Sequence, residues 1–152
     1  MAVKLSQISP EGYAKLNKKW CRFLSDPKKV YENDKGCWIW LGAQTGGVSY
    51  REDDKYPAIK VWEVDGGSFT CRGNIIAHFL ATSQVPHPFR TCISHRCHHS
   101  LCLNPRDLIH ETLADNSKRQ DCRRRGSCIC SNVVKCFPHV SRCLSYVPTL
   151  SM

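Results

Sequence analysis

The sequence contains no apolar run long enough to span a membrane, and its N-terminal residues lack the apolar segment that directs secretion. We therefore expect an intracellular protein without a membrane partner. Acidic residues are also few, since 13 Asp and Glu oppose 22 Lys and Arg and leave a net charge of +9. Such an excess indicates either a solvated basic surface or a polyanionic partner. The clusters Lys118-Arg119 and Arg123-Arg124-Arg125 favour the partner.

Eleven cysteines in 152 residues need an explanation. The two alternatives are a disulfide framework and zinc sites. The count is odd, no secretion signal is visible and the spacings are typical of metal sites, so zinc is the better interpretation. A chain of this length fits one domain without a large apolar core, and zinc binding would supply part of its folding energy.

The N-terminal third shows one helix and one strand. Ser9 and Pro10 predict a helix start, and the apolar residues Tyr13, Leu16, Trp20 and Phe23 continue at helical spacing to about residue 25. Residues 26–36 and 42–54 indicate polar loops. Between them, the aromatic segment 37–41 predicts a short strand.

A predicted hairpin follows, with strands over 57–64 and 68–72 and a turn at Asp65-Gly66-Gly67. Lys55, Lys60 and Arg72 make this ribbon basic. A two-stranded ribbon can lie in the major groove of DNA, and the alternative is an ordinary hairpin with solvated lysines. The apolar segment 74–81 then predicts a helix in which His78 is a core histidine, with a ligand role as the alternative.

The stretch 91–119 concentrates residues suited to metal chemistry. Cys97 and Cys102 are soft ligands on one loop, which zinc could hold. His95 lies two residues before Cys97, so a bound loop would hold its imidazole rigidly, as general-base chemistry requires. Asn116 offers a neutral oxygen to a hard cation such as Mg2+. We expect a strand, this loop, a strand over 109–113 and a helix over 114–122, with His95 and Asn116 facing each other.

Further cysteines extend this pattern toward both ends of the chain. A C-x5-C-x-C-x5-C cluster predicts a closed tetrahedral site of four thiolates, formed by Cys122, Cys128, Cys130 and Cys136. His139 and Cys143 lie close enough to replace a member. Cys37 is either a buried thiol or a distant ligand that joins Cys97 and Cys102. Residues 144–152 have no core pattern and are either disordered or wrapped around a partner subunit.

These motifs resemble the core of the His-Cys box homing endonucleases, a branch of the ββα-metal, or HNH-like, nucleases. The family pattern is roughly S-H-x-C-x4-C-x-N-P-x-H-L, followed by D-N and a second cysteine cluster. The matching segments here are 94–97, 102–108, 115–116 and 122–136. The upstream segments 37–40 and 77–78 resemble the family's lead-in, so the likeness covers about 37–136.

The resemblance implies an α+β fold that is small, mixed and zinc-stabilised, with a ββα-metal catalytic core and an antiparallel ribbon for DNA. It implies that His95 is the general base that activates water, and that Asn116 holds one catalytic Mg2+. Two structural zinc ions per chain are also implied. Their implied ligands are Cys37, Cys97 and Cys102 for the first, and Cys122, Cys128 and Cys136 for the second.

Three positions depart from the family pattern. Asp107 stands where the family has histidine; its carboxylate can serve as the fourth ligand of the first zinc, with His99 or His110 as alternatives. Cys130 replaces a histidine of the second site and leaves a zinc held by four thiolates. The family's active-site arginine has no clear match, and its candidates are Arg72 and Lys60.

The implied function is site-specific hydrolysis of phosphodiester bonds in double-stranded DNA by an intron-homing, Mg2+-dependent endonuclease. The expected single domain, 1–152, divides into an N-terminal helix and loop (1–36), the ribbon and ββα core (37–121), a second zinc loop (122–143) and a tail (144–152). Cutting both strands takes two centres or one centre that rebinds, and we expect a homodimer, located in the nucleus. The alternatives are a non-catalytic zinc-stabilised DNA-binding protein, a less specific HNH-type nuclease and a disulfide-rich secreted protein.

Overall fold

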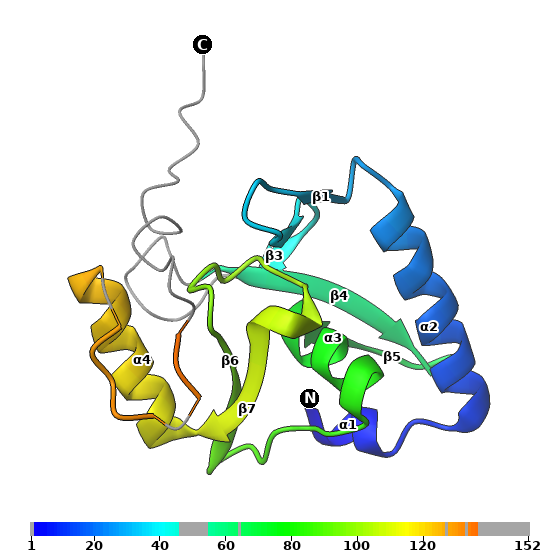
Figure 1. Ribbon diagram of the computed structural model, residues 1–152. Helices are drawn as coiled ribbons and strands as arrows, with labels where there is room; N and C mark the ends of the chain where they lie inside the picture. Colours follow the sequence, from blue (N-terminus) through cyan, green and yellow to red (C-terminus); the bar gives the residue numbers. More distant parts are fainter. Residues whose placement is uncertain (1, 46–54, 64, 127, 133, 137–152) are drawn as a thin grey trace.

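The computed structural model describes residues 2–45, 55–63, 65–126, 128–132 and 134–136. Short helices and small antiparallel sheets make up this part of the chain, as expected for an α+β fold (Figure 1). A sheet crosses the middle of the molecule, between helix α2 (Pro10–Ser25) at one end and helix α4 (Leu113–Arg125) at the other. Among the described helices, none combines the length and the apolar character needed to cross a membrane.

The N-terminal helix α2 forms where the sequence predicts it. The Ser9 hydroxyl accepts a hydrogen bond from the Gly12 N–H at 3.0 Å, and a proline occupies the first turn. Leu16 and Trp20 are buried on its inner face. A second helix, α1 (Ala2–Ser6), precedes it and buries Leu5 completely. Five residues are too few to show helical periodicity, so the sequence did not indicate α1.

Two expected loops contain strands. Strand β1 (Val30–Glu32) pairs antiparallel with β2 (Trp38–Trp40), so the segment 26–36 is not a loop throughout. Strand β3 (Gln44–Thr45) pairs with β4 (Tyr56–Trp62), so the basic hairpin belongs to a three-stranded sheet and not to a two-stranded ribbon. Strands of two or three residues show no alternating pattern, and only their pairing with longer neighbours reveals them.

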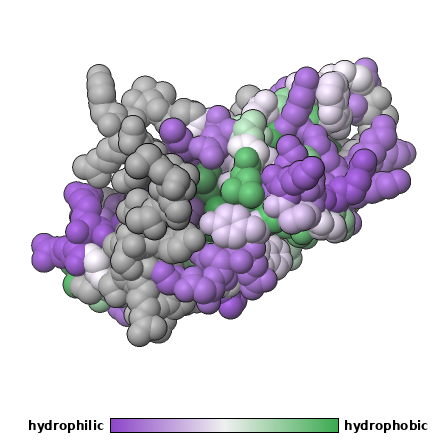
Figure 2. Space-filling view, turned by 90° about the horizontal axis from the view of Figure 1, so that it is seen from above, coloured by the Kyte–Doolittle hydropathy of each residue, from purple (hydrophilic) through white to green (hydrophobic). Residues whose placement is uncertain are grey.

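Strands β4 and β5 (Ser68–Arg72) pair in register from Ala58 with Arg72 to Trp62 with Ser68. Their side chains alternate, so the sheet has one apolar face and one exposed face. Helix α3 (Gly73–Thr82) packs against the apolar face. A Cβ at Gly73 would lie 2.6 Å from the Pro57 side chain, so only glycine allows this close approach. Viewed from above, the described surface is mostly hydrophilic around a small hydrophobic area (Figure 2).

A strand–loop–strand–helix unit completes the fold and confirms the expected order. Strands β6 (Thr91–His95) and β7 (Leu108–Thr112) pair antiparallel, and the 3-10 helix η2 (Pro105–Asp107) lies in the loop between them. Helix α4 begins where the Thr112 hydroxyl accepts a hydrogen bond from the Asp115 N–H at 3.1 Å. It ends at Gly126, whose φ of +71° suits glycine. The second strand begins one residue before its expected start, and the helix is longer at both ends.

Candidate metal clusters and active-site pocket

The first candidate metal cluster joins a cysteine beside β2 to the loop that follows β6. Two backbone hydrogen bonds, of 3.0 and 2.8 Å, connect β2 to residues 101–103. This pairing brings Cys37, which directly precedes β2, next to Cys97 and Cys102. Long-range strand pairing, and not local spacing, therefore assembles the three thiols.

An Asn-Pro turn brings a carboxylate to the same place. The Asn104 amide oxygen accepts a hydrogen bond from the Arg106 N–H at 3.1 Å and starts η2, at whose end Asp107 is fully buried. The Asp107 carboxylate accepts a hydrogen bond from the Cys102 thiol at 3.1 Å. Asp107, and neither His99 nor His110, completes the group of four found in the described part of the chain.

The chemistry of this first cluster fits a divalent metal. Its four ligand atoms lie within 4.8 Å of one another, and all four residues are buried. Hydrogen bonds among the thiols, above all the one with Cys102, lower the pKa of Cys37 to about 2 and raise the pKa of Cys97. Burial raises the pKa of Asp107. Four acidic groups in one buried space cannot all ionise without a cation, and the group could bind zinc.

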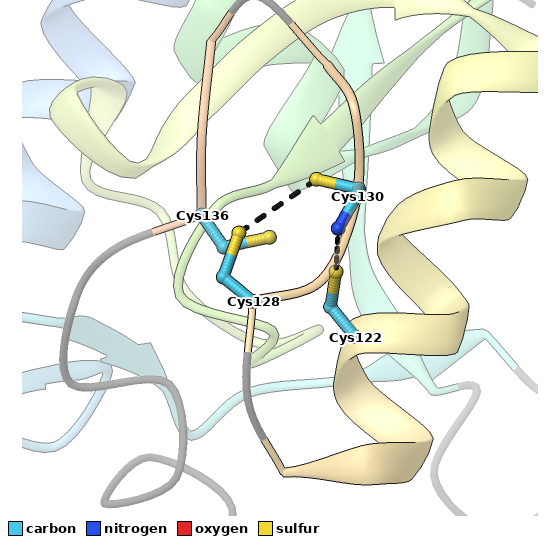
Figure 3. A group of neighbouring side chains, drawn as sticks. All are labelled: Cys122, Cys128, Cys130 and Cys136. Atoms are coloured by element: carbon cyan, nitrogen blue, oxygen red, sulfur yellow. Dashed lines mark hydrogen bonds between the residues drawn. The ribbon is translucent and has the colours of Figure 1, made fainter.

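The second cluster lies at the end of α4 (Figure 3). Its four sulfur atoms converge within 4.8 Å of one another, from Cys122, Cys128, Cys130 and Cys136. Cys122 belongs to α4 itself, and the other three follow the helix. The N–H groups of Ile129 and Cys130 each donate to the Cys122 sulfur at 3.3 Å. Four cysteine sulfurs in this arrangement are the ligand set of a closed tetrahedral site, so this group also could bind zinc.

Arg119 connects the second cluster to the rest of the fold. Its Nε donates to both carboxylate oxygens of Glu111, at 2.8 and 2.9 Å, and its two terminal nitrogens donate to the Val134 carbonyl and the Cys136 sulfur. The side chains of Arg119 and Glu111 are only 1% and 7% exposed. Arg119 is therefore buried in the fold, and of the pair Lys118-Arg119 only Lys118 is exposed to a polyanionic partner.

We expect elemental analysis of protein purified without added metal to give two zinc atoms per chain. Cys97→Ser and Cys128→Ser should each remove one zinc atom, because each deletes a ligand of a different cluster. Cys21→Ser is the matched control, since this exposed thiol on α2 belongs to neither cluster. A wild-type chain with a single zinc would contradict a metal role for the cluster that contains Asp107. His139 and Cys143, the alternative ligands of the second cluster, lie outside the described residues.

A pocket of about 410 Å3 lies between the sheet and the ββα unit. His95 and Asn116 both line it, together with Arg72 and Tyr56 from the sheet. The Arg72 guanidinium carbon lies 4.3 Å from the centre of the Tyr56 ring. Arg72 and Lys60 were the two candidates for the active-site arginine, and Arg72 is the one that lines the pocket.

The other two predicted DNA contacts lie elsewhere. Lys60 is on the exposed face of β4, with its ammonium 4.2 Å from the centre of the Trp62 ring. Lys55 is exposed directly before β4. Neither side chain lines the pocket.

His95 is held in one tautomer. Its Nε2 lies 3.0 Å from the Cys102 carbonyl oxygen. A carbonyl can only accept a hydrogen bond, so Nε2 carries the proton and Nδ1 carries none. Desolvation lowers the pKa of His95 to about 4, so the imidazole is neutral at pH 7. The loop of the first cluster therefore orients a nitrogen that can accept a proton.

Asn116 is oriented by a residue to which the sequence assigned no role. The buried Ser94 hydroxyl donates to the Asn116 amide oxygen at 3.0 Å. Ser94 and His95 are consecutive on β6, so one strand positions both the candidate base and the candidate cation ligand. The Ser-His pair in the motif was the available signal, but only the fold shows which group the hydroxyl contacts.

A pair of β-strands around a cysteine loop, followed by a helix, defines a ββα unit, here with two clusters that could bind zinc. A family model described as the zinc-binding loop region of homing endonuclease matches residues 56–151, more than half of the chain. The chain belongs to this family, which confirms the resemblance seen in its motifs. Comparisons with curated proteins and with solved structures find no match.

Proposed function

We propose that this protein is a Mg2+-dependent endonuclease of the site-specific, intron-homing type, which hydrolyses phosphodiester bonds in double-stranded DNA. One observation carries the proposal. In a homing-endonuclease family member, a neutral histidine and an oriented amide oxygen line one pocket. The histidine is His95 and the amide belongs to Asn116. A base and a cation ligand are the two groups that metal-assisted hydrolysis of a phosphodiester needs.

In this proposal, Nδ1 of His95 takes the proton from a water molecule aligned opposite the leaving oxygen. The Cys102 carbonyl, which accepts from Nε2 at 3.0 Å, keeps the ring oriented and stabilises the imidazolium that forms. A Mg2+ ion bound by Asn116 and the substrate would neutralise the charge that develops on the phosphate. The Arg72 guanidinium, at the same pocket, is suited to contact phosphate oxygens.

The two zinc ions have a structural role in this scheme. The first would hold the loop that orients His95, and the second would hold the segment that follows α4. No cluster residue lines the pocket, so neither metal would contact the substrate.

DNA would lie along the exposed face of the three-stranded sheet and reach the pocket at Arg72. Lys60, Thr70 and Arg72 lie on this face, and Lys55 precedes it. The net charge of +9 supports binding to a polyanion. Antiparallel strands also fit the major groove, where base edges can be distinguished.

Plasmid nicking at increasing Mg2+ concentrations tests the role of Asn116. Asn116→Ala should slow nicking and raise the Mg2+ concentration at half-maximal rate by at least about tenfold, because it deletes the proposed ligand. Ser94→Ala, which deletes only the orienting hydroxyl, should raise that concentration by about 10- to 100-fold, as expected for an outer-shell partner. Zinc content should be unchanged in both.

Ser117→Ala is the matched control, since this exposed residue neighbours Asn116 on the same helix. Identical Mg2+ curves for Asn116→Ala and wild type would overturn the metal role. A wild-type protein that binds DNA and never nicks it would instead be the non-catalytic DNA-binding protein. Cuts throughout the plasmid, in place of cuts at defined positions, would indicate the less specific HNH-type nuclease.

Cutting both strands takes two catalytic centres or one centre that rebinds, and we propose a homodimer that recognises a partly palindromic site. The segment that motivates this dimer, 144–152, lies outside the described residues. The dimer therefore stays a prediction. The nuclear location is a prediction as well.

A further inference from the structure

The pocket continues along α4 beyond the proposed catalytic residues. Asn116, Gln120 and Arg123 follow one another at spacings of four and three residues, so they share one face of the helix, and all three line the pocket. Arg123 lies about 10 Å further along the helix axis than Asn116 (seven residues at about 1.5 Å each). The pocket thus has a second, basic end.

The loop between β6 and β7 also contributes to this pocket. His98 and Ser100 line it. His98 has a left-handed backbone with φ of +58°, which is uncommon for a residue other than glycine. Its side chain is 8% exposed, and its Nε2 has no hydrogen-bond partner among the described residues. Backbone strain and an unpaired buried polar atom are typical of functional sites.

Within the proposed function, we propose that Arg123, assisted by Gln120, binds the phosphate that neighbours the scissile phosphate on the cleaved strand. The guanidinium can donate two parallel hydrogen bonds to one phosphate group, and the Gln120 amide can donate a third. Because of its offset along α4, Arg123 lies beyond the place where Asn116 and His95 would act on the scissile phosphate. A clamp on the neighbouring phosphate fixes the strand's register, so that the attacked phosphorus stays in line with His95.

The first test measures binding of a short, mixed-sequence DNA duplex at increasing salt, without Mg2+. The slope of log K against log salt is negative, and each lost phosphate contact reduces its magnitude by about 0.9. Slopes are compared below by magnitude. Arg123→Ala should lower the slope by about one, whereas Arg125→Ala should leave it nearly unchanged. Arg125 is the matched control, because it removes the same charge from the same helix at an exposed position outside the pocket. Equal slopes for the two variants would overturn the subsite.

Arg123→Lys separates a lost contact from a damaged fold. Lysine keeps the charge, so this variant should regain most of the slope while still binding more weakly than wild type, since it loses the bidentate geometry. Zinc content should equal that of wild type in all three variants. If Arg123→Lys has the same low slope as Arg123→Ala, charge at this position does not contact phosphate and the proposal is wrong.

The second test identifies the phosphate. A duplex that contains a mapped nick site is made with one uncharged phosphate at a time near the cut. Removing the charge beside the scissile phosphate should weaken binding to wild type and have little further effect on Arg123→Ala, because the partner is already absent. Coupling at the scissile phosphate, or at none, would overturn the assignment.

The subsite and the nuclease activity can fail separately. If the wild-type protein never nicks plasmid, yet Arg123→Ala reduces the salt dependence of DNA binding and Arg125→Ala does not, the phosphate subsite would stand and the proposed function would be wrong. If the wild-type protein nicks plasmid but Arg123→Ala and Arg125→Ala show the same salt dependence of DNA binding, the function would stand and the subsite would be wrong.

Discussion

Replacing His95 with alanine is expected to slow plasmid nicking by at least about 100-fold, in line with the range for a general base. His95 lines the pocket with Asn116, and its hydrogen bond to the Cys102 carbonyl at 3.0 Å leaves Nδ1 ready to accept a proton. Alanine removes this acceptor but none of the cluster ligands. The initial nicking rate in Mg2+, measured together with DNA affinity, checks the effect, and the affinity should stay nearly the same.

Two controls accompany the His95 experiment. His110→Ala removes an imidazole from the neighbouring strand β7. His110 does not line the pocket, although its Nε2 lies 2.8 Å from the hydroxyl of Thr91, which does. It should nick DNA at close to the wild-type rate and keep both zinc atoms, which also tests its rejection as a zinc ligand. Added imidazole should partly restore His95→Ala, because a diffusible base can occupy the space left behind. Full activity of His95→Ala would end the assignment.

Local sequence was most informative where function depends on consecutive residues. The C-x4-C and C-x5-C-x-C-x5-C spacings predicted which thiols lie together, and the structure brings each set within 4.8 Å. Asp107 joins the first group because an Asn-Pro turn sets its direction, and that turn is visible in the sequence. The order strand, loop, strand, helix followed from the same motif. Short-range spacing is reliable here because a few backbone angles determine it.

Features that depend on distant pairing could not be obtained this way. The sequence left Cys37 open between a core thiol and a ligand, and the hydrogen bonds from β2 to residues 101–103 determine its place. Arg119 lies in a basic segment of the sequence, which gave no sign that its side chain is buried. It is buried because it donates hydrogen bonds to Glu111, eight residues earlier, and to the Val134 carbonyl. The partner of the Ser94 hydroxyl is Asn116 on α4, and it could not be predicted without the position of that helix.

The charge of the second cluster gives the burial of Arg119 a physical reason. Four thiolates around one Zn2+ carry a net charge of −2, whereas the three thiolates and one histidine that the resemblance implies would carry −1. With zinc bound, Cys130 would add this extra negative charge. The Arg119 guanidinium donates to the Cys136 sulfur at 3.5 Å, close enough to offset part of it. The same side chain forms the ion pair with Glu111, so two acidic groups share one buried cation.

Arg119→Met is therefore expected to lower the free energy of unfolding by about 3–5 kcal/mol, the range for removing one partner of a buried ion pair. Methionine leaves the Glu111 carboxylate, only 7% exposed, without its cation. It also removes the hydrogen bonds to Val134 and Cys136 that hold the second cluster against the core. Urea unfolding in a zinc-buffered solution measures the difference.

Arg124→Met is the matched control on the same helix. Arg124 pairs with Asp121 at 3.3 Å, but both side chains are more than half exposed, so this change should lower the free energy of unfolding by no more than about 1 kcal/mol. The double variant Arg119→Met/Glu111→Leu should recover part of the stability, because it removes the unpaired carboxylate as well as its partner. Recovery would have a limit, since neither substitution restores the donor to Cys136, and the second zinc should remain easier to remove with a chelator. If Arg119→Met and Arg124→Met destabilise equally, burial adds nothing to the Arg119 pair, and the connection between the second cluster and the core must come from other contacts.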